Sequence, residues 1–225
     1  WYYDCQKEMN RTLIETADGS LTLFVPALNE HYHSTHGALQ EADHVFIQNG
    51  VACKNHLDSI RILEMGLGTG INAFLTMAWA KSYLGMVTYV GIEAFPVEEF
   101  LIDSCLQAVG CEDPLERSFF SQASYGRTQE LGNFRFLPRI AKWEEVDYTH
   151  EFDVVFYDAF GPRAQEEMWS MDNLERAYHA LGIGGLFTTY CAKGQVKRNL
   201  KALGFEVRSL PGPPGKREMT QAIKV

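Results

Sequence analysis

The sequence has few cysteines and no long hydrophobic run, and each scarcity excludes a class of protein. No apolar stretch approaches the roughly 18 residues that a membrane-spanning helix needs. No signal-peptide pattern is visible. The five cysteines are odd in number and widely spaced, which fits neither a disulfide framework nor a zinc motif. We therefore expect a cytoplasmic protein with reduced thiols, no bound metal and no membrane association.

Positive charge is also scarce. The chain has 20 basic and 29 acidic residues and a net charge of -9, which argues against general electrostatic binding to nucleic acid. The scarcity is uneven, because residues 193–225 contain eight basic and two acidic residues while the rest contains 12 and 27. A solvated surface and a local basic patch that meets phosphates are both compatible with this distribution.

Length and composition indicate a folded globular protein. With 225 residues and 46% hydrophobic residues, the chain forms one large domain or a main domain with a small appendage. Two β-prone runs around Ala17-Asp18-Gly19 predict a hairpin. Apolar residues at helical spacing over 38–46 predict a helix, with Ser34 or Thr35 as its cap. We expect residues 1–58 to form an N-terminal extension packed on a core of residues 59–225.

From residue 60 the pattern alternates between strands and helices. Strands are predicted at 61–65, 88–93, 134–140, 152–160 and 184–191, and helices at 71–83, 96–109 (with Pro96 in the first turn) and 195–205. Such alternation predicts a parallel sheet with helices on both faces, and two closing strands around a Pro/Gly-rich turn make the last strand antiparallel. By analogy this resembles the Rossmann-like, seven-stranded sheet of class I methyltransferases.

A glycine-rich loop follows the first of these strands. The stretch ILEMGLGTGIN places Gly66, Gly68 and Gly70 at alternate positions behind Glu64. Glycines let a backbone turn sharply and approach a ligand closely, and ligands bind at the carboxyl ends of parallel strands. The loop lacks the Gly-Lys-Ser/Thr ending of a phosphate-binding P-loop. The sequence therefore predicts a nucleotide-like ligand that is not held by a P-loop.

Acidic residues at three predicted strand ends narrow the ligand. Glu64, Glu93 and Asp158 would repel a pyrophosphate, whereas they suit the sulfonium and ammonium groups of S-adenosylmethionine (SAM). Glu93 is placed to accept hydrogen bonds from ribose hydroxyls, although it would do the same for NAD. Any one of the three acids could instead cap a helix.

The stretch YDAFGPRAQEEMW, after the fourth strand, suits an amine acceptor. Asp158 offers a carboxylate that can hold an ammonium group and accept or relay its proton. Phe160 can stack on a flat base, and Pro162 stiffens the turn. The plainer alternative makes Phe160 a core residue and Asp158 a cap.

Several segments resemble one family along nearly the whole chain: YHSTHGALQEADHVFIQNG, ILEMGLGTGIN, IEAFP, YDAFGPRAQEEMW, GGLFTTYCAKGQVKRNLKALGF and GPPGKREM. They resemble the methyltransferase domain of the MnmC and MnmD family, which makes 5-methylaminomethyl-2-thiouridine in bacterial tRNA. The Asp-x-Phe-x-Pro turn and the Lys-Arg-Glu-Met ending are more specific than the glycine loop.

The resemblance implies a catalytic residue, Asp158, and two sets of binding residues. The expected cofactor-binding residues are Glu64, Gly66, Gly68, Gly70, Asn72, Glu93, Phe95, Trp143 and Asp158. The expected substrate-binding residues are Tyr32, Ser34, Phe160, Pro162, Lys216 and Arg217. The chain departs from the family at Lys142, near the usual position of an acid that binds adenine, so we expect adenine to lie against Trp143.

The resemblance implies methyl transfer from SAM to the exocyclic amine of 5-aminomethyl-(2-thio)uridine at the tRNA wobble position. The expected partner is the tRNA anticodon stem-loop, with no stable protein partner. The FAD-dependent oxidase domain of the fused enzymes is absent from this sequence, so no flavin is expected. Two alternatives remain: a SAM-dependent methyltransferase or aminopropyltransferase-like enzyme for a small amine or polyamine, and a non-catalytic module that senses SAM or binds tRNA.

Overall fold

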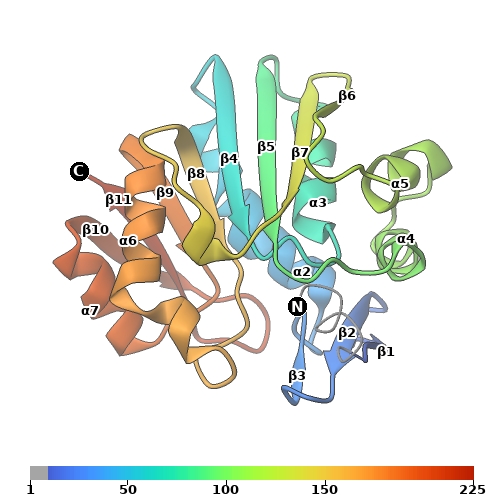
Figure 1. Cartoon of the computed structure of the whole chain (residues 1–225), viewed down its shortest axis with the longest axis horizontal. Helices are drawn as coiled ribbons and strands as arrows, with labels where there is room; N and C mark the ends of the chain where they lie inside the picture. Colours follow the sequence, from blue (N-terminus) through green and yellow to red (C-terminus); the bar gives the residue numbers. More distant parts are fainter. Residues whose placement is uncertain (1–9) are drawn as a thin grey trace.

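A central sheet of eight strands forms the body of the molecule (Figure 1). The computed structural model describes residues 10–225, and its sheet has the order β10-β11-β9-β8-β4-β5-β7-β6. The strands are β4 (Ser59–Met65), β5 (Met86–Glu93), β6 (Gln129–Leu131), β7 (Phe134–Ile140), β8 (Phe152–Tyr157), β9 (Leu181–Thr189), β10 (Phe205–Pro211) and β11 (Glu218–Lys224). Neighbours from β7 to β9 are parallel, whereas β11 is antiparallel to both β9 and β10.

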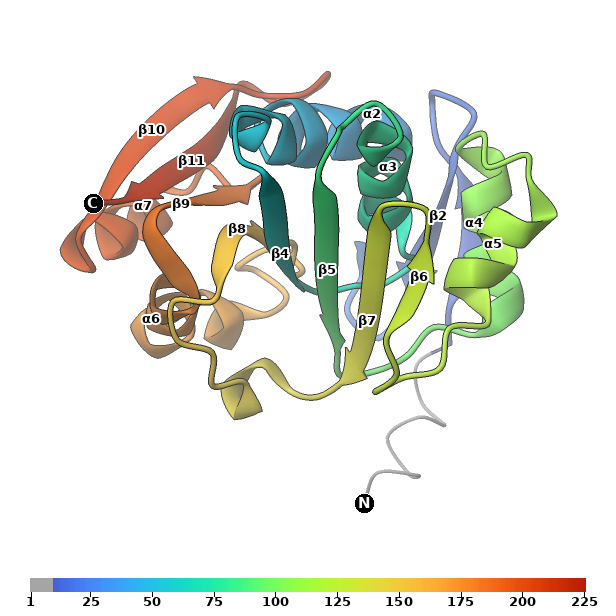
Figure 2. The same cartoon turned by 90° about the horizontal axis from the view of Figure 1, so that it is seen from above.

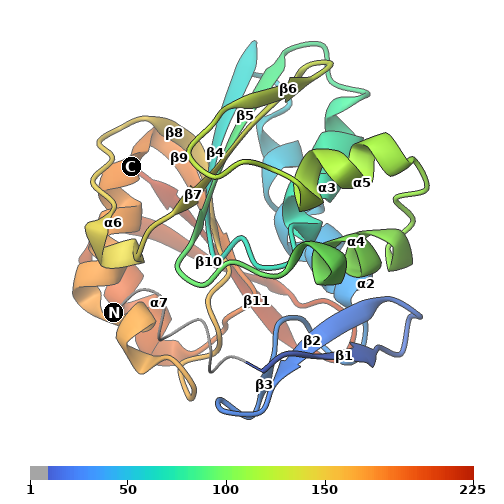
Figure 3. The ribbon, with the colours of Figure 1, turned by 45° about the vertical axis from the view of Figure 1, so that its right-hand side comes forward.

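Helices cover both faces of this sheet, as Figures 2 and 3 show. One face carries α3 (Ile71–Ala80), α4 (Glu99–Ala108) and α5 (Pro114–Ser121), and the other carries α6 (Met171–Ala180) and α7 (Gly194–Ala202). The short 3-10 helices η3 (Trp143–Glu145) and η4 (Glu166–Trp169) follow β7 and β8. Among the helices of residues 10–225, none has the length and apolar character that crossing a bilayer requires.

The two faces of the sheet have separate hydrophobic cores because successive strand side chains point in opposite directions. In β4, Ile62 packs into the core under α3, whereas Leu63 packs into the core under α6 and α7. In β8, Phe156 and Tyr157 divide in the same way. Strands buried on both faces explain the continuous apolar runs in the sequence.

The N-terminal segment forms a small second sheet and a short helical stretch. Its elements are β1 (Thr12–Glu15), β2 (Leu21–Val25), β3 (Glu30–His31), α2 (Ala38–Ala42), the π-helix η1 (Asp43–Gln48) and the 3-10 helix η2 (Val51–Lys54). The expected hairpin is confirmed, since Leu13 pairs with Leu23 in an antiparallel β1–β2 ladder. Leu23 and Val45 share the core that contains Ile62. The domain division at residue 58 stays a prediction.

Several expectations about the elements are wrong. The sheet has eight strands rather than seven, because β6 pairs with the outer edge of β7. Neither Ser34 nor Thr35 caps α2, whose N-cap residue is Gly37 without a side-chain hydrogen bond. Pro96 lies before α4, because the chain stays extended at the N-cap residue Glu98. The sequence analysis also missed α5, α6 and β6.

The cysteines agree with the expectation of free thiols where they are described. Cys53 is exposed, and Cys105, Cys111 and Cys191 are buried; all four are free. Cys5 lies outside the described residues.

Candidate active site

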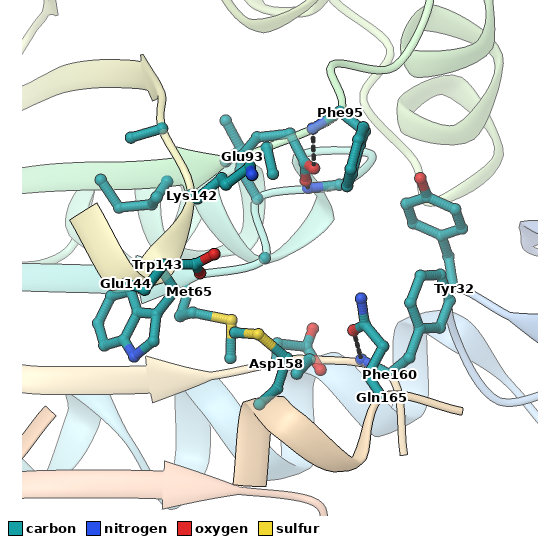
Figure 4. Close-up of a pocket in the computed structure, with 18 of the residues that line it drawn as sticks. Tyr32, Met65, Glu93, Phe95, Lys142, Trp143, Glu144, Asp158, Phe160 and Gln165 are labelled. Atoms are coloured by element: carbon teal, nitrogen blue, oxygen red, sulfur yellow. Dashed lines mark hydrogen bonds between the residues drawn. The ribbon is translucent and has the colours of Figure 1, made fainter. Parts of the chain in front are cut away.

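The candidate site lies where the winding of the sheet changes direction. The chain runs from β4 outward to β5 and β7, then returns to β8 on the other side of β4. Ligands bind at such switch points in open α/β sheets. Here the Asp158 backbone N–H donates to the Met65 carbonyl oxygen at 2.9 Å, which joins the turn after β8 to the loop after β4. A cavity of about 300 Å³ opens at this edge (Figure 4).

Two glycines bring the loop after β4 against this cavity. Gly66 has φ 89° and Gly68 has φ 52°, a region that glycine adopts readily. A Cβ on Gly66 would lie 2.5 Å from the Asp158 carbonyl oxygen, and one on Gly68 would lie 3.0 Å from the Tyr32 ring. Neither position has room for a side chain, so the loop packs directly against the Asp158 turn and the Tyr32 ring. Gly66, Leu67 and Gly68 also line the cavity, and we call this part of the loop the glycine cradle. Gly70 precedes α3 and lines a smaller neighbouring pocket instead.

Glu93, at the end of β5, is held by backbone groups. One carboxylate oxygen accepts from the Gly68 N–H at 2.9 Å, and the other accepts from the Phe95 N–H at 2.8 Å, the bond drawn in Figure 4. Burial raises the pKa of Glu93. Because each carboxylate oxygen has a second lone pair, Glu93 can still accept hydrogen bonds from a ligand in the cavity.

Asn72 joins two of the expected acids. Its Nδ2 donates to Glu64 Oε1 at 2.8 Å and to Asp158 Oδ2 at 2.9 Å. Glu64 is fully buried, and burial raises its pKa well above the ordinary value, which favours the neutral acid. Neither Glu64 nor Asn72 lines the cavity, and Asn72 connects Glu64 to Asp158, which does. The expected contribution of Glu64 and Asn72 to SAM binding stays a prediction.

Asp158 lines the cavity between the glycine loop and Phe160. Burial, helped by the nearby Glu41 carboxylate, raises the pKa of Asp158 to about 7, against the opposing effects of Asn72 and Lys216. Near neutral pH the group can therefore exist with or without its proton. Such a carboxyl can accept a proton more readily than an ordinary aspartate.

Tyr32 and Phe160 form an aromatic wall from distant parts of the chain. Their ring centroids lie 5.1 Å apart in an edge-to-face arrangement (Figure 4). Arg11 steadies this wall, because its Nε donates to the Tyr32 hydroxyl at 3.0 Å. Arg11 also donates to the Phe95 carbonyl oxygen at 2.6 Å, and thus ties the N-terminal segment to the turn after β5. No pattern in the sequence marks Arg11 for this role.

The cavity wall next to Glu93 comes from the segment after β7. Trp143 is buried and lines the cavity, and its Nε1 donates to the Asn173 carbonyl oxygen at 2.9 Å. Lys142 and Glu144 on either side of it also line the cavity. Glu144, two residues after Lys142, therefore places an acid in the region where the family usually has one.

The structure brings most, but not all, of the expected residues together. Those that line the cavity are Tyr32, Gly66, Gly68, Glu93, Phe95, Trp143, Asp158 and Phe160. Ser34, Pro162, Lys216 and Arg217 lie outside its lining. The Ser34 N–H donates to Glu41 at 3.3 Å, and Lys216 forms an ion pair with Glu41. Arg217 is exposed.

His33, Gln165 and Met168 line the cavity and were missed. His33 Nε2 lies 2.9 Å from the Thr69 hydroxyl. Burial, together with nearby Lys216, lowers the pKa of His33 to about 4, so the ring is neutral and adds no positive charge. Gln165 accepts from the Phe160 N–H at 3.2 Å. The segments YHSTHG and PRAQEEMW contain these residues, but nothing in their spacing distinguishes them from surface positions.

The arrangement fits SAM. The backbone of the glycine cradle faces the cavity, and Glu93 offers acceptor lone pairs. The carboxyl groups of Glu93, Glu144 and Asp158 suit a cationic ligand, which would favour their ionised forms. Apolar walls from Met65, Ile92, Phe95 and Trp143 suit a flat base. Within residues 10–225, no three His, Cys, Asp or Glu side chains are grouped so that they could hold a metal ion.

Comparisons with known proteins agree with this geometry. Residues 137–225 match a family model described as S-adenosyl-L-methionine-dependent methyltransferase. The crystal structure of MNMC2 from Aquifex aeolicus superposes with a TM-score of 0.80 at 25% identity, covering 96% of this chain and 71% of that one. Residues 137–225 are thus similar to the S-adenosyl-L-methionine-dependent methyltransferases, and the chain as a whole has a fold similar to that of MNMC2. The Rossmann-like fold and the use of SAM are thereby confirmed.

Curated relatives of this methyltransferase are named tRNA 5-methylaminomethyl-2-thiouridine biosynthesis bifunctional protein MnmC. The protein from Magnetococcus marinus is 27% identical over 97% of this chain and 35% of its own length. The protein from Cupriavidus necator is 32% identical over 88% of this chain and 32% of its own length. The methyltransferase thus spans about a third of the length of these relatives, and the family resemblance in the sequence is confirmed.

Proposed function

We propose that this methyltransferase transfers a methyl group from SAM to the exocyclic amine of 5-aminomethyl-(2-thio)uridine at the tRNA wobble position. The names of its relatives support this substrate. The observation that carries the proposal is Asp158, a carboxyl with its pKa raised to about 7, between a glycine cradle and the Phe160 ring. A single acid in that position serves both a cationic methyl donor and an amine acceptor.

The cofactor is assigned to the cavity as follows. Gly66 and Gly68 admit the amino-acid part of SAM, and Glu93 accepts hydrogen bonds from its ribose. Phe95 and Trp143 hold the adenine ring, with Glu144 near enough to the same wall to accept from its amine. When bound, SAM supplies a methyl group activated by the neighbouring positive sulfur. The proposal includes neither a metal nor a flavin.

Asp158 is assigned the acceptor amine. An alkyl ammonium must lose a proton before its nitrogen can attack a methyl carbon. Asp158 attracts the ammonium, fixes its direction and accepts or relays that proton. Phe160 and Tyr32 hold the uracil ring beside it by stacking and edge contact. Since the displacement is in line, much of the acceleration comes from this alignment. Asn72 holds the Asp158 carboxyl by a hydrogen bond, and Glu64 in turn holds Asn72.

The RNA is assigned to the carboxyl edge of the sheet. In the basic C-terminal stretch, Lys197 pairs with Glu218, Arg208 with Glu206 and Lys216 with Glu41, and Lys224 is buried. Lys193, Arg198, Lys201 and Arg217 are exposed. We assign phosphate contacts to Lys193 and Arg217, which follow β9 and β10, and to the exposed Arg163 after β8. The inward ion pair argues against the same role for Lys216.

The partner in this proposal is the anticodon stem-loop of tRNA, in the cytoplasm. Loop bases are accessible at modest cost because they are not locked in a duplex. A contact limited to a few cations leaves the acidic remainder of the surface away from the RNA. No stable protein partner is required by this arrangement.

A methyl-transfer assay tests the proposal. Labelled SAM and tRNA from cells that lack the activity are incubated with the protein, and nucleosides are resolved by mass spectrometry. We expect one added methyl group on 5-aminomethyl-2-thiouridine. Asp158→Asn should lower the rate by about 100-fold or more while SAM binding persists. Asp147→Asn, at an exposed position, is the control. Undiminished transfer by Asp158→Asn would refute the role of Asp158.

A second candidate acceptor is a small amine or polyamine. The acidic cavity and the net charge of -9 favour a small cation over a polyanion. Polyamines are offered to the same protein in the same assay. Methylated polyamine with unchanged tRNA would replace the proposed acceptor but keep the assignment of SAM.

A further inference from the structure

A partly buried ion pair lies next to the candidate site and is not explained by the proposed chemistry. Glu41 from α2 pairs with Lys216 from the turn between β10 and β11. Their side chains are 10% and 30% exposed, respectively. The other Glu41 oxygen accepts from the Ser34 N–H at 3.3 Å. The pair thus joins two segments that are 175 residues apart in the sequence.

The pair is attached to the turn that carries Asp158. The Lys216 ammonium lies 4.2 Å from the centre of the Tyr190 ring, a cation–π distance. The Tyr190 hydroxyl donates to the Ala159 carbonyl oxygen at 2.7 Å, one residue after Asp158. A contiguous path therefore runs from Glu41 through Lys216 and Tyr190 to the backbone of the Asp158 turn.

The two charges act on Asp158 in opposite directions. Glu41 helps to raise the pKa of Asp158, and Lys216 lowers it. The other ionisable groups that interact with Asp158 are Glu64, Tyr89 and Tyr190. Because burial favours neutral forms of those three, Glu41 and Lys216 are the charged groups that change the field at Asp158 near neutral pH.

A purely structural account of the pair is weak. Glu41 is 10% and Lys216 is 30% exposed, so part of the desolvation cost of a buried pair applies here and offsets part of the attraction. Apolar replacements of buried ion pairs are often neutral or stabilising. An apolar contact between α2 and the β10–β11 turn would therefore connect these segments equally well. A role for both charges follows if they adjust the ionisation of a nearby group, and Asp158 is such a group.

We propose that Glu41 and Lys216 are positioning residues for Asp158, holding its turn through Tyr190 and balancing its charge between the neutral acid and the carboxylate. The inference rests on the proposed function, because it takes Asp158 as the group that handles the acceptor amine. Neither residue lines the cavity, so neither is assigned a contact with the reacting atoms.

Charge-removing variants give opposite expectations. Glu41→Gln removes a negative charge and leaves Lys216 unpaired, and both changes favour the Asp158 carboxylate. Its pKa should fall by about half a pH unit or more. Lys216→Met removes the positive charge and leaves Glu41 unpaired, so the pKa should rise by a similar amount. The double variant should return toward the parent value.

The direct measurement is an NMR titration of the full chain with carbon-13-labelled aspartate carboxyls, the Asp158 signal being assigned by its loss in Asp158→Asn. The acidic limb of the rate–pH profile is then compared for the same variants. Opposite shifts of the titration and of the limb support the proposal. Shifts in the same direction, or no shift in folded variants, overturn it.

Charge-conserving variants keep the test decisive if a charge-removing variant does not fold. Glu41→Asp and Lys216→Arg should leave the Asp158 titration within about 0.3 pH unit of the parent, because each retains its charge. A shift by Lys216→Arg as large as that expected for Lys216→Met would overturn the charge-balancing role. Failure of the proposed function is separable, because the parent protein would then not methylate tRNA while its Asp158 titration could still be measured.

Discussion

At the scale of single residues, Asp158 lies in an environment that destabilises the ionised form of its carboxyl group. It is partly buried near two other acids, Glu41 and Glu64, and has one amide donor, Asn72. The environment raises its pKa to about 7 rather than stabilising its anion. Such a group is useful for proton handling and costly for folding, since strained or destabilised groups gather at functional sites.

The same shift predicts a pH-dependent effect on stability. The pKa of Asp158 rises from 3.8 to about 7, so the folded chain holds a proton that the unfolded chain has released. The penalty therefore grows as the pH rises from about 4 to about 7 and is constant above that. Asp158→Asn should be more stable than the parent at pH 8, by on the order of a few kcal/mol at most, and the difference should shrink toward pH 4.

Denaturant unfolding of the two proteins at pH 4, 6 and 8 checks this expectation. A stability difference that does not change with pH would contradict the raised pKa. Asp147→Asn, at an exposed site, serves as the matched control and should show no comparable trend.

The site residues that could be predicted from the sequence are those that lie at the carboxyl ends of strands. Glu93 and Asp158 each follow an apolar run, and parallel strands bring their carboxyl ends to one edge. Arg11, His33 and Glu41 come from the N-terminal segment, whose place beside that edge depends on tertiary packing. No local pattern marks Glu41 as buried, because it also fits the polar side of a helix.

At the scale of elements, the loop between β4 and α3 allows a matched comparison of two glycines. Gly66 and Gly70 both have positive φ, 89° and 75°. A Cβ at Gly66 would lie 2.5 Å from the Asp158 backbone, whereas one at Gly70 would have no atom within 4 Å. Gly66→Ala should weaken SAM binding by about tenfold or more, because the loop or the Asp158 turn must move. Gly70→Ala should cost only backbone strain, about 1 kcal/mol.

Calorimetric titration with SAM and thermal unfolding of both variants separate these effects. We expect a small loss of stability for Gly70→Ala and a larger loss for Gly66→Ala, whose Cβ would clash with the backbone, with a large loss of SAM affinity for Gly66→Ala alone. Equal SAM affinities in the two variants would show that the contact between Gly66 and the Asp158 turn does not determine SAM binding.

Elements with strong patterns were predictable, and those whose boundaries depend on distant contacts were not. The central strands β4, β5 and β8 have buried apolar runs that mark them clearly. The edge strand β6 has only three residues and two exposed positions, which leaves little periodicity to detect. The start of α4 was misplaced because Arg11 holds the Phe95–Pro96 turn outside the helix, a contact across more than 80 residues.

At the scale of the whole molecule, the charge distribution predicts a local and modest electrostatic contact with RNA. A triple variant, Arg163→Gln, Lys193→Gln and Arg217→Gln, should raise the KM for tRNA and leave SAM affinity unchanged. If each residue meets one phosphate, the slope of log affinity against log salt should become less steep by about 2. Binding measurements from low to physiological salt give this slope.

Arg61 and Arg135 provide the matched control. They lie toward the amino ends of β4 and β7, at the opposite edge of the sheet, and pair with Glu151 and Glu130. Replacing both with glutamine changes the net charge without touching the proposed surface. The control removes two positive charges and the test variant removes three, so losses are compared per charge removed. An equal loss of tRNA affinity per charge would indicate a general charge effect rather than the proposed contact.

The class of fold could be predicted as a whole because alternating strands and helices, followed by a hairpin, permit few arrangements. The order of the strands in the sheet cannot be predicted from any single segment of the sequence. It follows from right-handed crossovers and from which apolar faces meet. The sequence therefore predicted a parallel sheet with helices on both faces, whereas the eight-strand count needed the structure.

The place of β11 has a consequence for biosynthesis. Although β11 follows β10 in the sequence, it lies inside the sheet, between β9 and β10. While a ribosome is still making β11, the side of β9 that later pairs with it, at Leu186–Thr189, has no hydrogen-bonding partner. The other side of β9 can already pair with β8. An unpaired strand edge is prone to association with other chains. Until translation passes residue 224, the edge of β9 that β11 covers in the folded protein stays open to such association.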